Sequence, residues 1–247
     1  MSRHWLPAVL VLGATLVAGT ACSTAGTPTA AAGSTTTATT TAAPSPVTVS
    51  DIKSAIQSAS AVHIKGTMTD SGSSVSLDVQ INKDGSASGT LGEGGANIPI
   101  VFTKKVVYIQ FTADVMKANG VDATGAAGQL LLNKWVPSTS PVLSGSGIVS
   151  GVTPLLDYTT FTGNLIQQIP AGTPKAGKTD TVGGTPVQLY TFSDGTVADI
   201  ATAGPHYVMR LTPSASQGSG SIDFTGWNQP VAVHAPPASQ IYAGPGA

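Results

Sequence analysis

Residues 75–91, VSLDVQINKDGSASGTL, decide the fold of this chain. Apolar side chains stand at every second position from Val75 to Ile81, and polar side chains fill the positions between them. This is the period of a strand with one buried face. Lys83-Asp84-Gly85 then supplies a hairpin turn, and a weaker strand runs from Ser86 to Leu91. The stretch therefore predicts an antiparallel hairpin with one apolar face.

The same alternation continues on both sides of this hairpin. It predicts further strands at 63–69, 98–102, 107–111, 134–136, 178–182, 186–192, 196–201, 207–211 and 219–224, with 231–234 closing the sheet. Two helices interrupt the strands: one from Ser50, as the N-cap, to Ala61, and one that Thr153 caps and that ends at Ile169, before Pro170. Residues 138–151 are rich in Ser and Gly and predict a loop. The fold class is α+β, in a single domain with a large antiparallel sheet.

A sheet of this size curls, and helices must cover its apolar face. A strongly curved sheet under a helix leaves a hollow, and an apolar hollow binds apolar ligands. The residues that we expect to line such a cavity are Leu77, Val79, Ile100, Phe102, Ile109, Phe111, Leu155, Phe161 and Leu165. Periodicity alone favours the alternative, in which these side chains fill a packed core.

The N-terminus has the form of a secretory signal. Arg3 and His4 begin the chain, an apolar run from Leu6 to Val17 follows, and small residues lead to Cys22. Residues 1–21 are therefore predicted to be removed, and the apolar run is short for a membrane span.

Cys22 gives this signal the form of a bacterial lipobox, although Gly19 stands where a Leu is usual. The resemblance implies that the thiol of Cys22 receives a diacylglyceryl group with fatty acids such as palmitate, and that a signal peptidase then cuts the chain directly before Cys22. An ordinary signal peptide with a nearby cysteine is the alternative. Residues 22–49 then form a disordered Thr/Ala/Ser/Pro tether, residues 50–236 the folded domain, and residues 237–247 a flexible tail.

Composition excludes several classes of function. Charged residues make up 9% of the chain and the formal net charge is −1, so no basic field is present for nucleic acid. Cys22 is the single cysteine, which rules out an intrachain disulfide. His63, His206 and His234 each stand alone in the mature sequence, so we expect no metal and no cofactor.

No catalytic motif is present. Gly145-Ser146-Gly147 lacks the spacing of a nucleophile elbow, and no phosphate-binding loop occurs. Asp199 and Asp223 are expected on solvent faces, where they pair with Arg210 as a surface salt bridge. The sequence therefore predicts that the protein is not an enzyme. An envelope hydrolase is the weakest hypothesis, and a clustered Ser, His and Asp would revive it.

The organisation of the chain resembles the actinobacterial envelope lipoproteins of the LppX, LprA, LprF and LprG group. The segments that carry the resemblance are the lipobox with its tether, AVHIKGTMT (61–69), VSLDVQINKDGSASGTL (75–91), VVYIQ (106–110), the helix ending at Ile169, KTDTVGGTPVQLYTF (178–192) and DFTGWNQPVAVHAPP (223–237). The resemblance implies a half-barrel sheet backed by helices, whose cavity binds acylated lipids or glycolipids.

The function that follows is that of a lipid carrier or chaperone, held by its lipid anchor on the extracytoplasmic face of the cell membrane. Its expected partners are an acylated lipid or glycolipid, the membrane, and an envelope lipid exporter. The alternative is a surface lipoprotein that acts as a structural or interaction module.

Overall fold

The computed structural model describes residues 47–70, 72–93, 95–143 and 147–244. The predicted signal, Cys22 and most of the tether lie outside the described residues. The helices are α1 (Val49–Ser58), α2 (Ala113–Ala118), α3 (Ala126–Leu131), α4 (Ile148–Leu156) and α5 (Tyr158–Gln168), with 3₁₀ turns at Ala215–Gln217 and Ala238–Gln240. The strands are β1 (Ala61–Asp70), β2 (Ser73–Asn82), β3 (Ser86–Glu93), β4 (Ala96–Thr103), β5 (Val106–Gln110), β6 (Trp135–Pro137), β7 (Lys175–Val182), β8 (Thr185–Thr191), β9 (Val197–Ala201), β10 (Val208–Thr212) and β11 (Ser219–Thr225).

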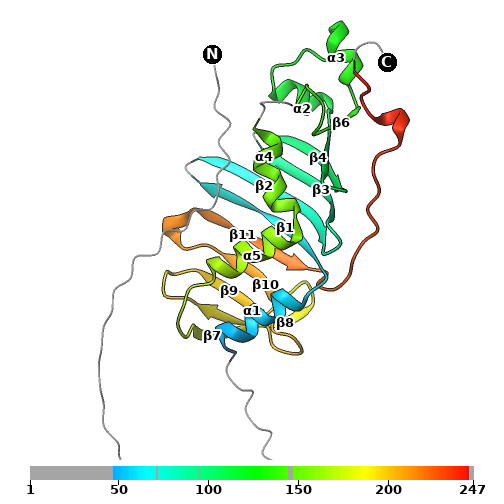
Figure 1. Cartoon of the computed structure of the whole chain (residues 1–247). Coiled ribbons are helices and arrows are strands. Elements are labelled where there is room, and N and C mark those ends of the chain that lie inside the picture. The colour runs from blue at the N-terminus through cyan, green and yellow to red at the C-terminus, as the bar shows by residue number, and fades with distance from the viewer. Residues whose placement is uncertain (1–46, 71, 94, 144–146, 245–247) are drawn as a thin grey trace, which may run out of the picture. The chain divides into compact units, whose positions relative to one another are not determined.

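All eleven strands form one antiparallel sheet, in the order β6-β5-β4-β3-β2-β1-β11-β10-β9-β8-β7 (Figure 1). Strands β1 to β6 form one meander and strands β7 to β11 form another. The two meet where β1 pairs with β11, with Ile64 opposite Phe224. The sheet is open, and β6 and β7 are its two ends. The predicted fold class is confirmed.

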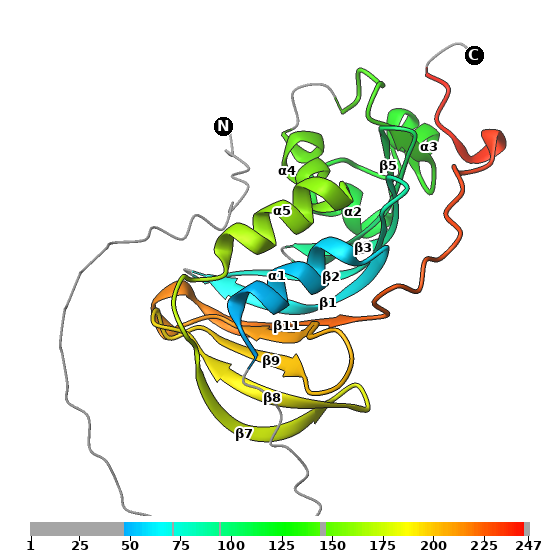
Figure 2. The same ribbon diagram turned by 60° about the horizontal axis from the view of Figure 1, so that its bottom comes forward.

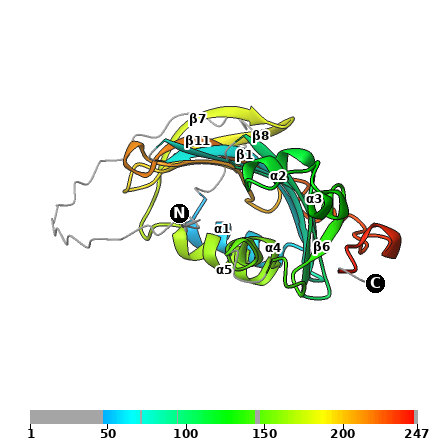
Figure 3. The same cartoon turned by 90° about the horizontal axis from the view of Figure 1, so that it is seen from above.

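The sheet bends around α1, α4 and α5, which lie on its concave side (Figures 2 and 3). Glycine makes the tight approach of neighbouring strands feasible. A Cβ atom on Gly66 would lie 2.2 Å from the backbone oxygen of Ser221, and a Cβ atom on Gly89 would lie 2.1 Å from that of Asp78. No side chain fits at these distances, so only glycine can occupy these two positions.

Helix α1 begins and ends slightly before its predicted limits. The cap is Thr48 rather than Ser50, because Thr48 and Asp51 form a reciprocal capping box. Its buried face consists of Ile52, Ala55 and Ile56. The helix ends at Ser58, since Ala59 is already extended and leads into β1.

The prediction of one helix from Thr153 to Ile169 is wrong. Two helices occupy the segment, and Asp157 separates them with an extended backbone (φ −81°, ψ 113°). The side chain of Asp157 accepts a hydrogen bond from the backbone N–H of Thr160 at 2.8 Å and so caps α5. Pro154 lies inside α4 instead of at its start, and α4 begins within the predicted loop.

The prediction that residues 231–234 close the sheet is also wrong. Strand β11 already pairs on both sides, with β1 and β10, so the chain leaves the sheet at Gly226 (φ 58°). The amide side chain of Asn82 takes the place of a partner strand there. It donates to the backbone oxygen of Val231 at 2.8 Å and accepts from its N–H at 3.2 Å.

The C-terminal segment reaches the far end of the sheet. Ile241 forms a parallel bridge with Trp135, and the N–H of Tyr242 donates to the backbone oxygen of Trp135 at 2.9 Å. Lys134 donates to the backbone oxygen of Ser239 at 2.9 Å. These contacts cover part of the open edge of β6, which would otherwise present unpaired backbone groups.

Candidate functional site

The concave face of the sheet carries a continuous apolar surface. One register row crosses it from β11 to β6, and side chains of this row pack in a single hydrophobic cluster. The row consists of Phe224, Ile64, Val79, Gly89, Ile100, Ile109 and Val136. Strand alternation places these residues on one face, as the sequence period required.

The structure brings all nine predicted cavity residues into that cluster. Six of them are buried: Val79, Ile100, Phe102, Ile109, Phe111 and Leu165. Leu77 on β2, Leu155 on α4 and Phe161 on α5 are half-buried and pack against the others. The side chains therefore come from the sheet on one side and from the helix pair α4–α5 on the other.

Aromatic side chains join α5 to the centre of the sheet. The rings of Phe161 and Phe224 lie 6.4 Å apart, and those of Phe224 and Trp227 lie 6.3 Å apart. Trp227 stacks on Tyr207 at 4.8 Å and donates its indole N–H to the backbone oxygen of Val208 at 3.0 Å. Trp227 is thus a buried packing residue.

Tyr158 fixes the start of α5. Its hydroxyl donates a 2.7 Å hydrogen bond to the backbone oxygen of Ala59, just after α1. Burial raises the pKa of Tyr158 to about 12, so its hydroxyl keeps its proton at neutral pH. This bond ties α5 to the junction of α1 and β1.

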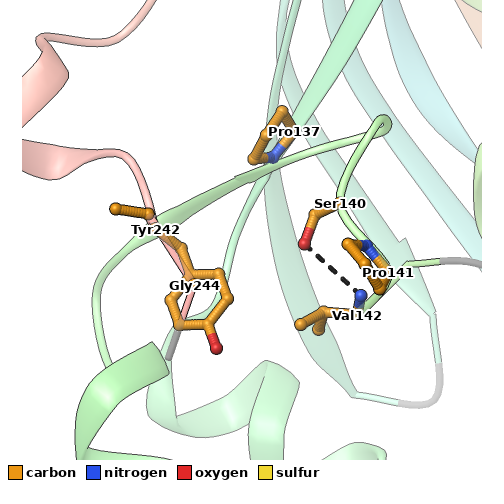
Figure 4. A pocket seen from close by; sticks show the side chains of 7 residues that line it. Pro137, Ser140, Pro141, Val142, Tyr242 and Gly244 are labelled. Carbon is orange, nitrogen blue, oxygen red and sulfur yellow. Dashed lines mark hydrogen bonds between the residues drawn. The ribbon is translucent and has the colours of Figure 1, made fainter. Parts of the chain in front are cut away.

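Two pockets lie away from the nine residues. One, of about 280 Å³, is lined by Pro137, Ser140, Pro141, Val142, Tyr242, Ala243 and Gly244 (Figure 4). The other, of about 360 Å³, lies beside α1 and includes Asp51, Ser54 and His206. Neither is lined by any of the nine, so the cavity stays a prediction.

The opposite face of the sheet carries a row of alternating charges. Asp199, Arg210, Asp223, Lys65 and Asp78 stand in register on five consecutive strands. Arg210 donates to both carboxylate oxygens of Asp223, and Lys65 contacts Asp78 at 2.8 Å. The pKa of Arg210 is raised, chiefly by its hydrogen bond to Asp223, and the pKa of Asp78 is lowered, chiefly by Lys65.

Asp199 is an exception within this row. We expected it on a solvent face, but it is only 8% exposed, and its Oδ1 atom has no hydrogen-bond partner. Arg210 directs its guanidinium to Asp223 instead. Burial therefore raises the pKa of Asp199, although the charge of Arg210 opposes the shift. The expected ion pair between Arg210 and Asp223 forms, whereas Arg210 forms no ion pair with Asp199 among the described residues.

A Thr, a His and an Asp lie in line on the same face. The hydroxyl of Thr225 is 3.3 Å from Nδ1 of His63, whose Nε2 is 2.7 Å from Asp78. Sequence analysis missed this cluster, because its members come from three strands. In a serine protease the hydroxyl lies at Nε2 of the histidine and the carboxylate at Nδ1, which is the reverse of the arrangement here. Asp78 also forms an ion pair with Lys65. Neither pocket includes these residues, so we interpret the cluster as part of the surface charge row.

Within residues 47–244, apart from the gaps given above, no cluster of three or more His, Cys, Asp or Glu side chains is placed to hold a metal ion. The helices that the structure describes include none with the length and apolarity to span a bilayer.

The arrangement described above, an open curved antiparallel sheet with helices on its concave side, occurs in a solved protein. The domain has the LprF fold. The crystal structure of LprF from Mycobacterium bovis superimposes with a TM-score of 0.51 at 14% sequence identity, over 76% of this chain and 94% of LprF. The lipoprotein LppX of Mycobacterium tuberculosis gives a TM-score of 0.45 at 15% identity, over 75% of this chain and 96% of LppX. The sequence matches no protein-family profile and no curated protein.

The LprF fold confirms the architecture that the family resemblance implied. The likeness reaches almost the full length of LprF. At this level of identity it concerns the fold alone.

Proposed function

We propose that this chain is a lipid-anchored envelope protein that holds the acyl chains of a lipid between the concave face of its sheet and helices α4 and α5. It acts as a carrier or chaperone and carries out no chemistry on its ligand. The observation that carries this proposal is the apolar surface shared by sheet and helices, with Leu77, Leu155 and Phe161 only half-buried. The predicted lipidation of Cys22 supplies the anchor.

Burial of hydrocarbon accounts for the affinity. Each CH₂ group removed from water contributes about 0.8 kcal/mol, so an acyl chain of ordinary length has ample driving force for entry. Part of that gain is offset by the cost of separating α4 and α5 from the sheet. Acylated lipids or glycolipids are therefore the ligands that we expect, and an envelope lipid exporter is the expected donor or acceptor.

Lipid analysis of the purified protein tests the proposal. A full chain with Cys22→Ser cannot carry the thiol-linked diacylglyceryl group, so an acylated lipid that mass spectrometry finds in fixed stoichiometry after exchange into detergent and its removal is a ligand. We expect about one lipid per protein when the chain is exported in an actinobacterial host. A protein that is lipid-free, and that also fails to take up added glycolipid, would leave only the alternative of an interaction module.

A matched pair of variants locates the ligand. Leu155→Asp puts a charge on the half-buried side of α4, and Ser150→Asp puts the same charge on an exposed position of the same helix. We expect Leu155→Asp to abolish lipid loading and Ser150→Asp to keep it, with both proteins folded by circular dichroism. Equal loading of both variants would place the lipid elsewhere.

A further inference from the structure

Helix α4 carries no charged residue and lies at the surface, where Ser150 and Pro154 are exposed. The uncharged stretch that includes its sequence, IVSGVTPLL, extends from Trp135 to Leu156. Of the residues in α4, only Leu156 is buried, while Ile148, Val149, Val152 and Leu155 are half-buried against the core. Helix α4 is therefore incompletely covered in this structure.

The helix is also weakly built. Its N-cap is Gly147, at φ 74°, which forms no side-chain capping bond. Pro154 inside the helix has no N–H to donate to the backbone oxygen of Ser150. The hydroxyl of Thr153 donates to the backbone oxygen of Val149 at 2.6 Å, an arrangement that slightly destabilises and bends helices. A nine-residue helix with these features depends on its tertiary contacts.

Helix α5 also has a threonine hydroxyl that donates to the i−4 backbone oxygen, from Thr162 to Tyr158 at 2.7 Å, but it is capped and anchored where α4 is not. Asp157 caps it, and Tyr158 bonds to the backbone oxygen of Ala59. Thr162 and Leu165 are buried, and Phe161 lies against Phe224 of the central strand. Its contacts reach both α1 and the middle of the sheet, so it belongs to the rigid part of the domain.

A single extended residue, Asp157, connects these two unlike helices, and it directly follows the buried Leu156. Hinges are loop or element-terminal residues that absorb changes in φ and ψ, and Asp157 occupies such a position between α4 and α5. We propose that α4 is a gate over the apolar concave face, which swings about Asp157 while α5 stays in place and so admits the acyl chains of the ligand. This inference rests on the proposed function and assigns the regulation of the same site.

Hydrogen exchange of the full Cys22→Ser chain, followed by mass spectrometry, tests the gate without any ligand. We expect the amides of α4 to exchange at least about 100-fold faster than those of α5, because α4 opens without unfolding of the domain. Equal exchange rates in the two helices would overturn the gate, whether or not the protein binds lipid.

Two variants that strengthen a helix test whether the opening of α4 controls uptake of the ligand. Pro154→Ala restores a backbone donor at an exposed position of α4, whereas Gly163→Ala strengthens α5, where an added Cβ atom meets nothing within 4 Å. With a fluorescent long-chain fatty acid as probe, Pro154→Ala should slow both α4 exchange and probe uptake by about tenfold. Gly163→Ala should change neither.

The possible results distinguish failure of the gating proposal from failure of the proposed carrier function. Slower α4 exchange with unchanged uptake in Pro154→Ala would overturn the gate and leave the proposed function intact. If neither the parent chain nor the variants bind the fatty acid or glycolipid, the proposed function fails and the gate fails with it. Slowing of exchange and uptake together, in Pro154→Ala alone, is the result that supports both.

Discussion

Substitution of Gly89 by Ala tests whether the contact between β2 and β3 requires a residue without a side chain. Gly89 lies on β3, opposite Val79 on β2 and Ile100 on β4, and its φ is 156°. A Cβ atom there would lie 2.1 Å from the backbone oxygen of Asp78 and 2.7 Å from the Cα atom of Val79. Both contacts are with backbone, so no side chain can rotate to relieve them.

The size of the effect follows from this overlap. Strands β2 and β3 must separate by roughly an ångström, which weakens about two ladder hydrogen bonds at about 1 kcal/mol each. The unfavourable dihedral angle of a non-glycine residue adds about 1–3 kcal/mol. The free energy of unfolding should therefore fall by about 3–5 kcal/mol, a large part of the 5–15 kcal/mol typical of a domain.

Urea unfolding, followed by the fluorescence of Trp135 and Trp227, measures this loss. Gly85→Ala is the first control: its φ is 82°, but nothing lies within 4 Å of an added Cβ atom, so a cost of about 1 kcal/mol is expected. Gly163→Ala in α5 is the second control, and it should stabilise the protein by about 1 kcal/mol. If Gly89→Ala costs no more than Gly85→Ala, strand crowding is not what requires glycine here.

Two further predictions concern single polar groups. Tyr158→Phe removes the hydrogen bond to Ala59 and leaves the backbone oxygen of Ala59 unpaired at a buried position. The free energy of unfolding should therefore fall by about 1–2 kcal/mol, and the amides of α5 should exchange faster. Unchanged exchange in α5 would mean that this bond does not hold the helix. Asp199→Asn removes a buried carboxylate whose pKa is raised by burial. Because the folded protein binds this proton more tightly than the unfolded chain does, the penalty for the charge is full above the folded pKa and disappears below the ordinary Asp pKa. The variant should therefore be more stable than the parent by about 1 kcal/mol at neutral pH and no more stable at about pH 3, and an equal gain at both pH values in urea unfolding would contradict the assignment.

Local patterns determined most of the strands. The alternation from Val75 to Ile81 identifies the buried face of this strand, because every second side chain of a strand points to the same side. The nine apolar residues predicted to line a cavity all pack in one hydrophobic cluster. Whether they enclose a cavity depends on the fit between helices and sheet, which no sequence period encodes.

The tertiary structure alone decided the features that join distant parts of the chain. It broke the predicted helix at Asp157, because the side chain there caps α5 and α4 follows a different path over the sheet. It removed residues 231–234 from the sheet, because β11 had both of its partners already. It buried Asp199, which sequence reasoning placed in solvent. Each of these depends on which strands become neighbours, and strand pairing at long sequence separation is a property of the whole fold, whereas helix and strand periods are properties of short segments.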